Sequence, residues 1–190
     1  QTAHVTIFCL RPNRLRANFL RVTINGRDKE VRLSDGLKGG LKDGYKERNM
    51  KLGMHAGPQD LTMDELKRLW QTGDTNGFHW ISVWDHFYAN PLADRENPCF
   101  EGVAAMAGLA ASTEKVRVGC LVFCALFRNP GVLAKAGVTI DHLSGGRADV
   151  GIGAGWFEEE FRESSTFFPT GIRKRFMVTY LMTNTNFSCH

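Results

Sequence analysis

Residues 116–156 constrain the fold more than any other stretch, because they read as one complete strand–helix–strand unit. The run 116–123 is apolar and β-branched, which is typical of a strand buried on both faces. Asn129 and Pro130 then form a helix start, with asparagine as the N-cap and proline where a missing N–H costs nothing. The stretch therefore predicts a parallel β–α–β unit, and α/β proteins bind ligands at the carboxyl ends of such strands.

Glycines lie before and after the second strand of this unit. Gly145 and Gly146 are expected to end the helix, because glycine adopts positive φ without strain. Residues 148–152 form the next short apolar strand, and the sequence Gly-x-Gly-Ala-Gly occupies residues 151–155. Backbone N–H groups of such a segment can approach a phosphate or a ribityl chain, whereas a turn without a ligand is the alternative interpretation.

The same alternation of strands and helices is predicted for the preceding residues. Predicted strands start near residues 51, 80, 116 and 148, and an interval of about 30 residues is that of repeated βα units. Thr62 and Glu65 have the spacing of a capping box, which predicts a helix that Gly77 ends. An alanine-rich helix is predicted over residues 98–113. The fold class is therefore α/β, with about the first four βα units of a TIM (β/α)8 barrel.

Three segments are expected along the chain. Residues 50–162 carry the βα rhythm, and residues 163–190 are an unassigned tail in which 177–182 is a strand candidate. Residues 1–49 hold 11 Lys and Arg against 5 Asp and Glu, so they form a basic extension. This extension is interpreted as poorly structured or as a small ordered appendage, with a hairpin candidate (22–24 with 30–33) around Asn25-Gly26. A half-barrel has open sheet edges, so we expect marginal stability or association into a homo-oligomer.

Composition and charge limit the classes of partner that the chain is expected to bind. The net charge of +4 comes from the flanks, because residues 50–162 hold 10 basic and 14 acidic residues, and this argues against nucleic-acid binding. No apolar run reaches membrane-spanning length, and the amino terminus lacks a signal-peptide pattern. The five cysteines form no C-x-x-C pair, which favours reduced thiols in a cytoplasmic protein, and no metal site is expected. We therefore expect a small-molecule substrate and neither a nucleic-acid nor a membrane partner.

Six segments occur in a specific order: MKLGMHAGPQ, WISVWDHF, VRVGCLV, FRNP, DHLSGGR and GIGAGWFEEEF. Together they strongly resemble the bacterial luciferase-like monooxygenase family over residues 50–162. That family contains flavin-dependent monooxygenases and oxidoreductases that use the deazaflavin coenzyme F420, on a TIM barrel with the cofactor ring at the carboxyl ends of the strands. The resemblance implies a truncated oxidoreductase or monooxygenase that uses FMN or coenzyme F420. The alternative is a non-catalytic half-barrel fragment that binds no cofactor or self-associates.

The resemblance assigns catalytic roles to Asp85 and His86, which follow the second predicted strand. Histidine titrates near neutral pH and can donate to a reduced ring or to a substrate oxygen, and the resemblance places His86 near the cofactor ring. The alternative is a histidine that caps the strand structurally. His55 ends the first strand, where it either lines the substrate pocket or is a satisfied core histidine.

Two segments are predicted to bind the cofactor. Gly119–Val122 match a place where the family often has a non-proline cis peptide behind the ring, and Leu121–Val122 is the candidate bond, with an ordinary strand as the alternative. The predicted cofactor-binding residues are Leu121, Val122, Gly153, Ala154 and Gly155. Glu158, Glu159 and Glu160 are interpreted as the acidic first turn of a helix, and Arg128 as the anchor of the loop before Asn129. A Rossmann-type site is disfavoured because the G-x-G-x-x-G motif is missing.

Overall fold

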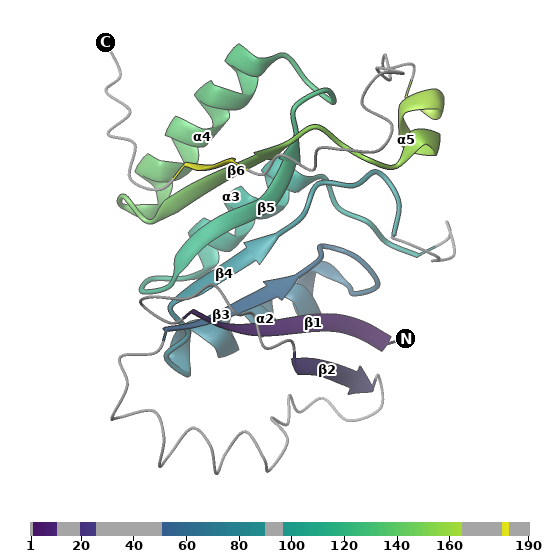
Figure 1. Ribbon diagram of the computed structural model, residues 1–190. Helices are drawn as coiled ribbons and strands as arrows, with labels where there is room; N and C mark the ends of the chain where they lie inside the picture. Colours follow the sequence, from purple (N-terminus) through teal and green to yellow (C-terminus); the bar gives the residue numbers. More distant parts are fainter. Residues whose placement is uncertain (1, 11–19, 26–50, 90–96, 165–179, 183–190) are drawn as a thin grey trace.

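The computed structural model describes residues 2–10, 20–25, 51–89, 97–164 and 180–182. Its seven strands form one sheet in the order β2-β1-β3-β4-β5-β6-β7 (Figure 1). The four central strands are parallel and are joined by helices. They are β3 (Lys51–Ala56), β4 (Trp80–Val83), β5 (Arg117–Cys124) and β6 (Ala148–Gly153), and the connecting helices are α2 (Met63–Thr75), α3 (Gly102–Ser112) and α4 (Pro130–Ser144). This confirms the predicted α/β class and its four βα units.

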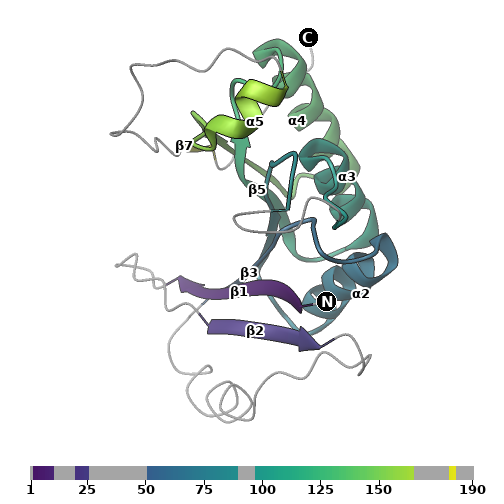
Figure 2. The same ribbon diagram turned by 90° about the vertical axis from the view of Figure 1, so that its right-hand side faces the viewer.

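The hydrophobic core lies between the central strands and these helices, which pack on one face of the sheet (Figure 2). Each strand sends alternate side chains toward the helices, as its period of two requires. The core includes Met54, Leu66, Trp70, Ile81, Val83, Met106, Leu109, Val118, Leu133 and Ile140. The other face of the sheet carries the Trp80 ring, which packs over Gly119, and the hydrogen-bonded pair His55 and Ser82. Among the described residues, no helix has both the length and the apolar character that crossing a membrane requires.

The flanks add three antiparallel strands. β1 (Thr2–Leu10) pairs with both β2 (Leu20–Asn25) and β3, and β7 (Tyr180–Met182) pairs with β6. In these segments the chain extends the sheet and is not an unstructured extension, since pairing satisfies the N–H and C=O groups that the edges of β3 and β6 would otherwise expose. The predicted hairpin partner at 30–33 lies outside the described residues. Among the described strands, β2 pairs with β1.

Helix ends follow the sequence signals in α2 and α4. Thr62 caps α2, with both reciprocal bonds of the capping box to Glu65 present. Asn129 caps α4 by accepting the N–H of Gly131, and the helix ends at Gly145, whose φ is 68°. These three ends confirm the predictions.

The start of α3 differs from its prediction at residue 98. The preceding segment is tied to the loop after β3, because Asp60 N–H donates to Pro98 O and Phe100 N–H donates to Pro58 O. Helix α3 therefore begins at Gly102, with Glu101 accepting the N–H of Ala104. Glu101 thereby also faces the carboxyl end of β4, where the predicted catalytic residues lie.

Candidate active site

The predicted site residues come together at the carboxyl edge of the parallel sheet. His55 lies near the end of β3, Asp85 and His86 follow β4, and the 153–155 segment ends β6. Parallel strands bring these positions to one edge, although His55 and Asp85 are about 30 residues apart in sequence and His86 and Gly153 are about 70 apart. The short helix α5 (Glu158–Glu163) follows β6 and packs back onto the segment after β4 (Figure 1).

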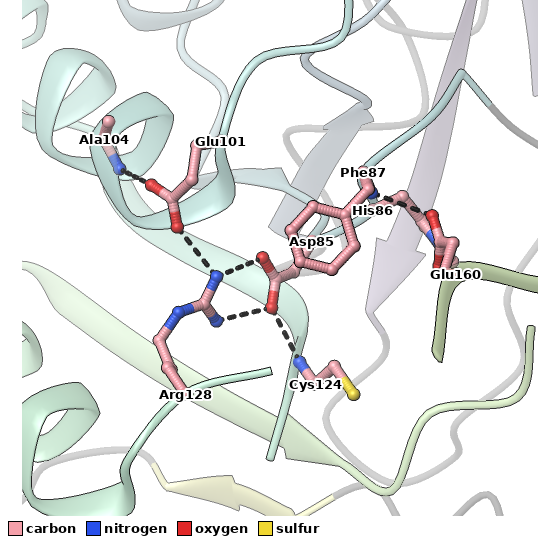
Figure 3. Close-up of polar contacts among 8 residues, drawn as sticks. All are labelled: Asp85, His86, Phe87, Glu101, Ala104, Cys124, Arg128 and Glu160. Carbon is pink, nitrogen blue, oxygen red and sulfur yellow. Dashed lines mark hydrogen bonds and ion pairs between the residues drawn. The ribbon is translucent and has the colours of Figure 1, made fainter. Parts of the chain in front are cut away.

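Asp85 forms a buried ion pair with Arg128. The guanidinium donates to Asp85 Oδ2 at 2.6 Å and to Oδ1 at 2.8 Å, and the backbone N–H of Cys124 also donates to Oδ2 at 2.8 Å. Arg128 also donates a hydrogen bond to Glu101 at 2.7 Å, so its guanidinium lies between two carboxylates (Figure 3). The hydrogen bonds to Asp85 raise the pKa of Arg128. The network joins the ends of β4 and β5 to the start of α3, so Arg128 anchors more than the loop that precedes Asn129.

This network bears on the catalytic role predicted for Asp85. Its side chain is 3% exposed, and both of its oxygens accept hydrogen bonds from the chain itself. A carboxylate engaged in this way fixes the geometry of its neighbours. In this structure Asp85 is placed to hold the backbone that carries His86.

His86 pairs with a residue that sequence reasoning did not select. Its Nδ1 lies 2.8 Å from Glu160 Oε2, while Glu160 Oε1 accepts the backbone N–H of Phe87 at 2.8 Å and of Tyr88 at 3.3 Å. Glu158, Glu159 and Glu160 form the acidic first turn of α5, as predicted, but Glu160 is buried, with 1% of its surface exposed. A six-residue helix with three consecutive glutamates offers no periodicity that would single out the buried one. Only its place beside the buried Phe161 hints at it.

Aromatic side chains form a row around His86. The ring of His86 lies 6.1 Å from that of Trp84 and 5.8 Å from that of Trp156, at interplanar angles of 85° and 75°. The ring of Trp84 also lies edge to face with that of His55, at a centroid distance of 5.4 Å. Trp156 is 56% exposed, whereas Trp84 Nε1 is buried and has no hydrogen-bond acceptor among the residues that the structure describes. This edge of the sheet therefore offers aromatic surface together with a buried N–H donor.

His55 is held inside the structure. Its Nδ1 lies 2.7 Å from the hydroxyl of Ser82, and burial lowers its pKa to about 4. The imidazole is therefore neutral at neutral pH. These contacts match the satisfied core histidine, and a substrate contact by His55 stays a prediction.

The peptide bond between Leu121 and Val122 is cis, as predicted. The register between β5 and β6 shifts at this point, between Cys120 and Phe123. The Val122 side chain then occupies space over β6: a Cβ at Gly153 would lie 2.6 Å from its Cγ2, and one at Gly151 would lie 3.0 Å from its Cγ1. Two glycines of the Gly-rich segment thus make room for Val122.

The end of that segment has its own steric requirement. Gly155 has φ of 79°, and a Cβ there would lie 2.4 Å from Phe161 Cζ and 2.8 Å from Cys124 Sγ. Ala154 is half-buried beside it. Close packing explains the glycines, and cofactor contacts by residues 153–155 remain predictions. The described residues hold no group of three or more metal-ligating side chains, and burial raises the pKa of Cys99 to about 12 and of Cys124 to about 11.

Comparison with known proteins matches the chain to one family. The family model described as luciferase-like monooxygenase matches residues 49–175. An FMNH2-dependent dimethylsulfone monooxygenase of Pseudomonas putida is 33% identical over 100 residues, which are 53% of this chain and 26% of that protein. An F420-dependent glucose-6-phosphate dehydrogenase of Rhodococcus erythropolis is 31% identical over 122 residues, 64% of this chain and 35% of that protein.

A solved structure shows the same fold. The structure of an F420-dependent secondary alcohol dehydrogenase in complex with an F420-acetone adduct superposes with a TM-score of 0.55 at 25% identity. The match covers 64% of this chain and 36% of that one. In each of these comparisons the chain matches only about a quarter to a third of the relative's length.

Proposed function

Because the chain belongs to the luciferase-like monooxygenase family, we propose that it forms part of an oxidoreductase that uses reduced FMN or reduced coenzyme F420 on a small-molecule substrate. The observation that carries the proposal is the placement of His86. It stands at the carboxyl edge of the parallel sheet, between two indoles and against a buried carboxylate. Relatives named for each cofactor support both alternatives. The matched span is only part of each relative, so the activity of the whole enzyme is itself part of the proposal.

The residues present fit a planar cofactor ring that carries carbonyl oxygens. Trp84 Nε1 is a buried donor without an acceptor among the described residues, and leaving such a group unpaired costs about 1–3 kcal/mol. Trp156 offers a largely exposed indole next to His86. Val122 and the 153–155 segment would form the wall on the β5–β6 side. When bound, the cofactor supplies a hydride, or the electrons that activate oxygen.

Each side chain of the site has a distinct proposed task. His86 exchanges a proton with the reacting group, because an imidazole can act as donor through one nitrogen and as acceptor through the other. Asp85 positions the segment that carries His86 through its ion pair with Arg128. The aromatic row gives the cofactor ring apolar surface to pack against beside His86.

A binding titration tests the proposal. Oxidised FMN and F420 are added separately to the chain while cofactor fluorescence is followed, and His86→Ala is compared with His142→Ala. His142 lies on the exposed side of α4, so its removal serves as the matched control. We expect saturable binding of one cofactor, weakened by His86→Ala only. Binding of neither cofactor would refute the proposal for this chain and favour the non-catalytic fragment.

A further inference from the structure

We propose that Glu160 is a positioning residue for His86, which fixes the tautomer of the imidazole and thereby selects Nε2 as the nitrogen that exchanges a proton. The statement about the tautomer depends only on the structure. The consequence for the reaction rests on the proposed function, because it requires that His86 acts on the substrate or cofactor.

The first argument is the geometry of the carboxylate. Glu160 Oε2 lies 2.8 Å from His86 Nδ1, at ion-pair distance, and the side chain is 1% exposed. A carboxylate oxygen can only accept hydrogen bonds, so the imidazole nitrogen that faces it must carry the proton. Figure 3 shows Glu160 beside His86. In the neutral ring the proton then sits on Nδ1, which leaves Nε2 as the nitrogen that can gain or lose a proton.

The second argument is that the other oxygen is committed elsewhere. Glu160 Oε1 accepts the backbone N–H groups of Phe87 and Tyr88, the two residues directly after His86. These bonds prevent the carboxylate from rotating away from the ring. One side chain of α5 therefore holds both the backbone and the imidazole at the end of β4. This arrangement is needed to set a tautomer, since a mobile acceptor would permit both forms.

The third argument is that the ring itself is held. Trp84 and Trp156 approach the imidazole edge to face, at 85° and 75°. The indoles restrict the ring plane, and Glu160 restricts rotation within that plane. The direction of Nε2 is thereby determined by three side chains, two from the segments that follow β4 and β6 and one from α5.

Glu160→Gln tests the inference because it inverts the tautomer with little change of shape. The amide oxygen of Gln keeps the acceptor for Phe87 and Tyr88, which turns its NH2 group toward His86 Nδ1. That NH2 can only donate, so Nδ1 must accept and the proton moves to Nε2. Glu163→Gln is the matched control: it removes a carboxylate from the same helix, one that contacts the Tyr88 hydroxyl.

The readout is the pair of ring nitrogen shifts of 15N-labelled His86, measured by NMR at a pH where the ring is neutral. We expect the Nδ1–H form in the unchanged chain and in Glu163→Gln, and the Nε2–H form in Glu160→Gln. Turnover should fall about 10²–10⁴-fold in Glu160→Gln, the range for a general acid–base group in the wrong tautomer. Cofactor binding should change little, so that kcat falls more than KM rises.

Two results would overturn the inference. An Nε2–H form in the unchanged chain would show that Glu160 does not set the tautomer, even if Glu160→Gln failed to fold. An inverted tautomer with unchanged turnover would remove the catalytic consequence. Failure of the proposed function is distinguishable, because a chain that binds neither cofactor still reports its tautomer.

Discussion

The role of Asp85 yields a quantitative prediction, since removing its carboxylate breaks a buried ion pair. The Asp85 side chain is 3% exposed and that of Arg128 is 17% exposed, and truncating one partner of such a pair costs about 3–5 kcal/mol. Arg128 keeps Glu101, but that carboxylate is 48% exposed and offsets only about 0–1 kcal/mol. The Cys124 N–H also loses its acceptor. We therefore expect Asp85→Ala to lower the free energy of unfolding by about 3–5 kcal/mol.

Urea unfolding followed by circular dichroism measures this loss. If Asp85→Ala does not fold, Asp85→Asn serves instead; it keeps one acceptor for Cys124 N–H and should lose about 1–3 kcal/mol. In the double variant with Arg128→Met no buried charge remains unpaired, so its loss should be smaller than the sum of the single losses. A loss below about 0.5 kcal/mol in Asp85→Ala, as at an ordinary surface position, would refute the structural role.

Two further predictions concern a glycine and a histidine. Gly155→Ala and Gly146→Ala both place a side chain at positive φ, at a cost of about 1–2 kcal/mol. Only Gly155→Ala also meets a neighbour, with a Cβ 2.4 Å from Phe161, so it should lose about 1–3 kcal/mol more in urea unfolding; equal losses would contradict the packing. For His55, whose pKa is lowered to about 4, the unfolded chain binds more protons, so stability should rise from pH 4 to about 6.5 and be lost as pH falls. His55→Gln should remove that part of the pH dependence, and identical profiles would contradict the burial of the imidazole.

Most of the fold could be predicted because its signals are local. The Thr62 capping box, the Asn129 N-cap and Gly145 each fix a helix end through bonds within a few residues. The prediction that α3 starts at residue 98 is wrong, because backbone hydrogen bonds with the distant loop around Pro58 hold the chain before Gly102. The pairing of β1 with β3 joins residues about 40–50 positions apart, which no local pattern reports.

The sequence predicted where the site lies better than it predicted which side chains contact one another there. The resemblance located His86 and the cis peptide between Leu121 and Val122, since both belong to ordered motifs. It did not identify Glu160, which approaches His86 across 74 positions and looks like its two acidic neighbours. The catalytic role that it assigns to Asp85 stays a prediction. It did not report the ion pair of this carboxylate with Arg128, which lies on the next strand–helix connection.

The central claim is that the cofactor ring binds at the carboxyl edge beside His86, and the indole N–H signals test it most directly. The chain has four tryptophans, and in NMR spectra of tryptophan-labelled protein each gives one such signal. Adding the cofactor that binds should shift the signals of Trp84 and Trp156, which flank His86, and leave that of Trp70, on α2 at the helix-covered face, unchanged. Saturable binding that leaves Trp84 and Trp156 unshifted, or that shifts Trp70 equally, would contradict the proposed site.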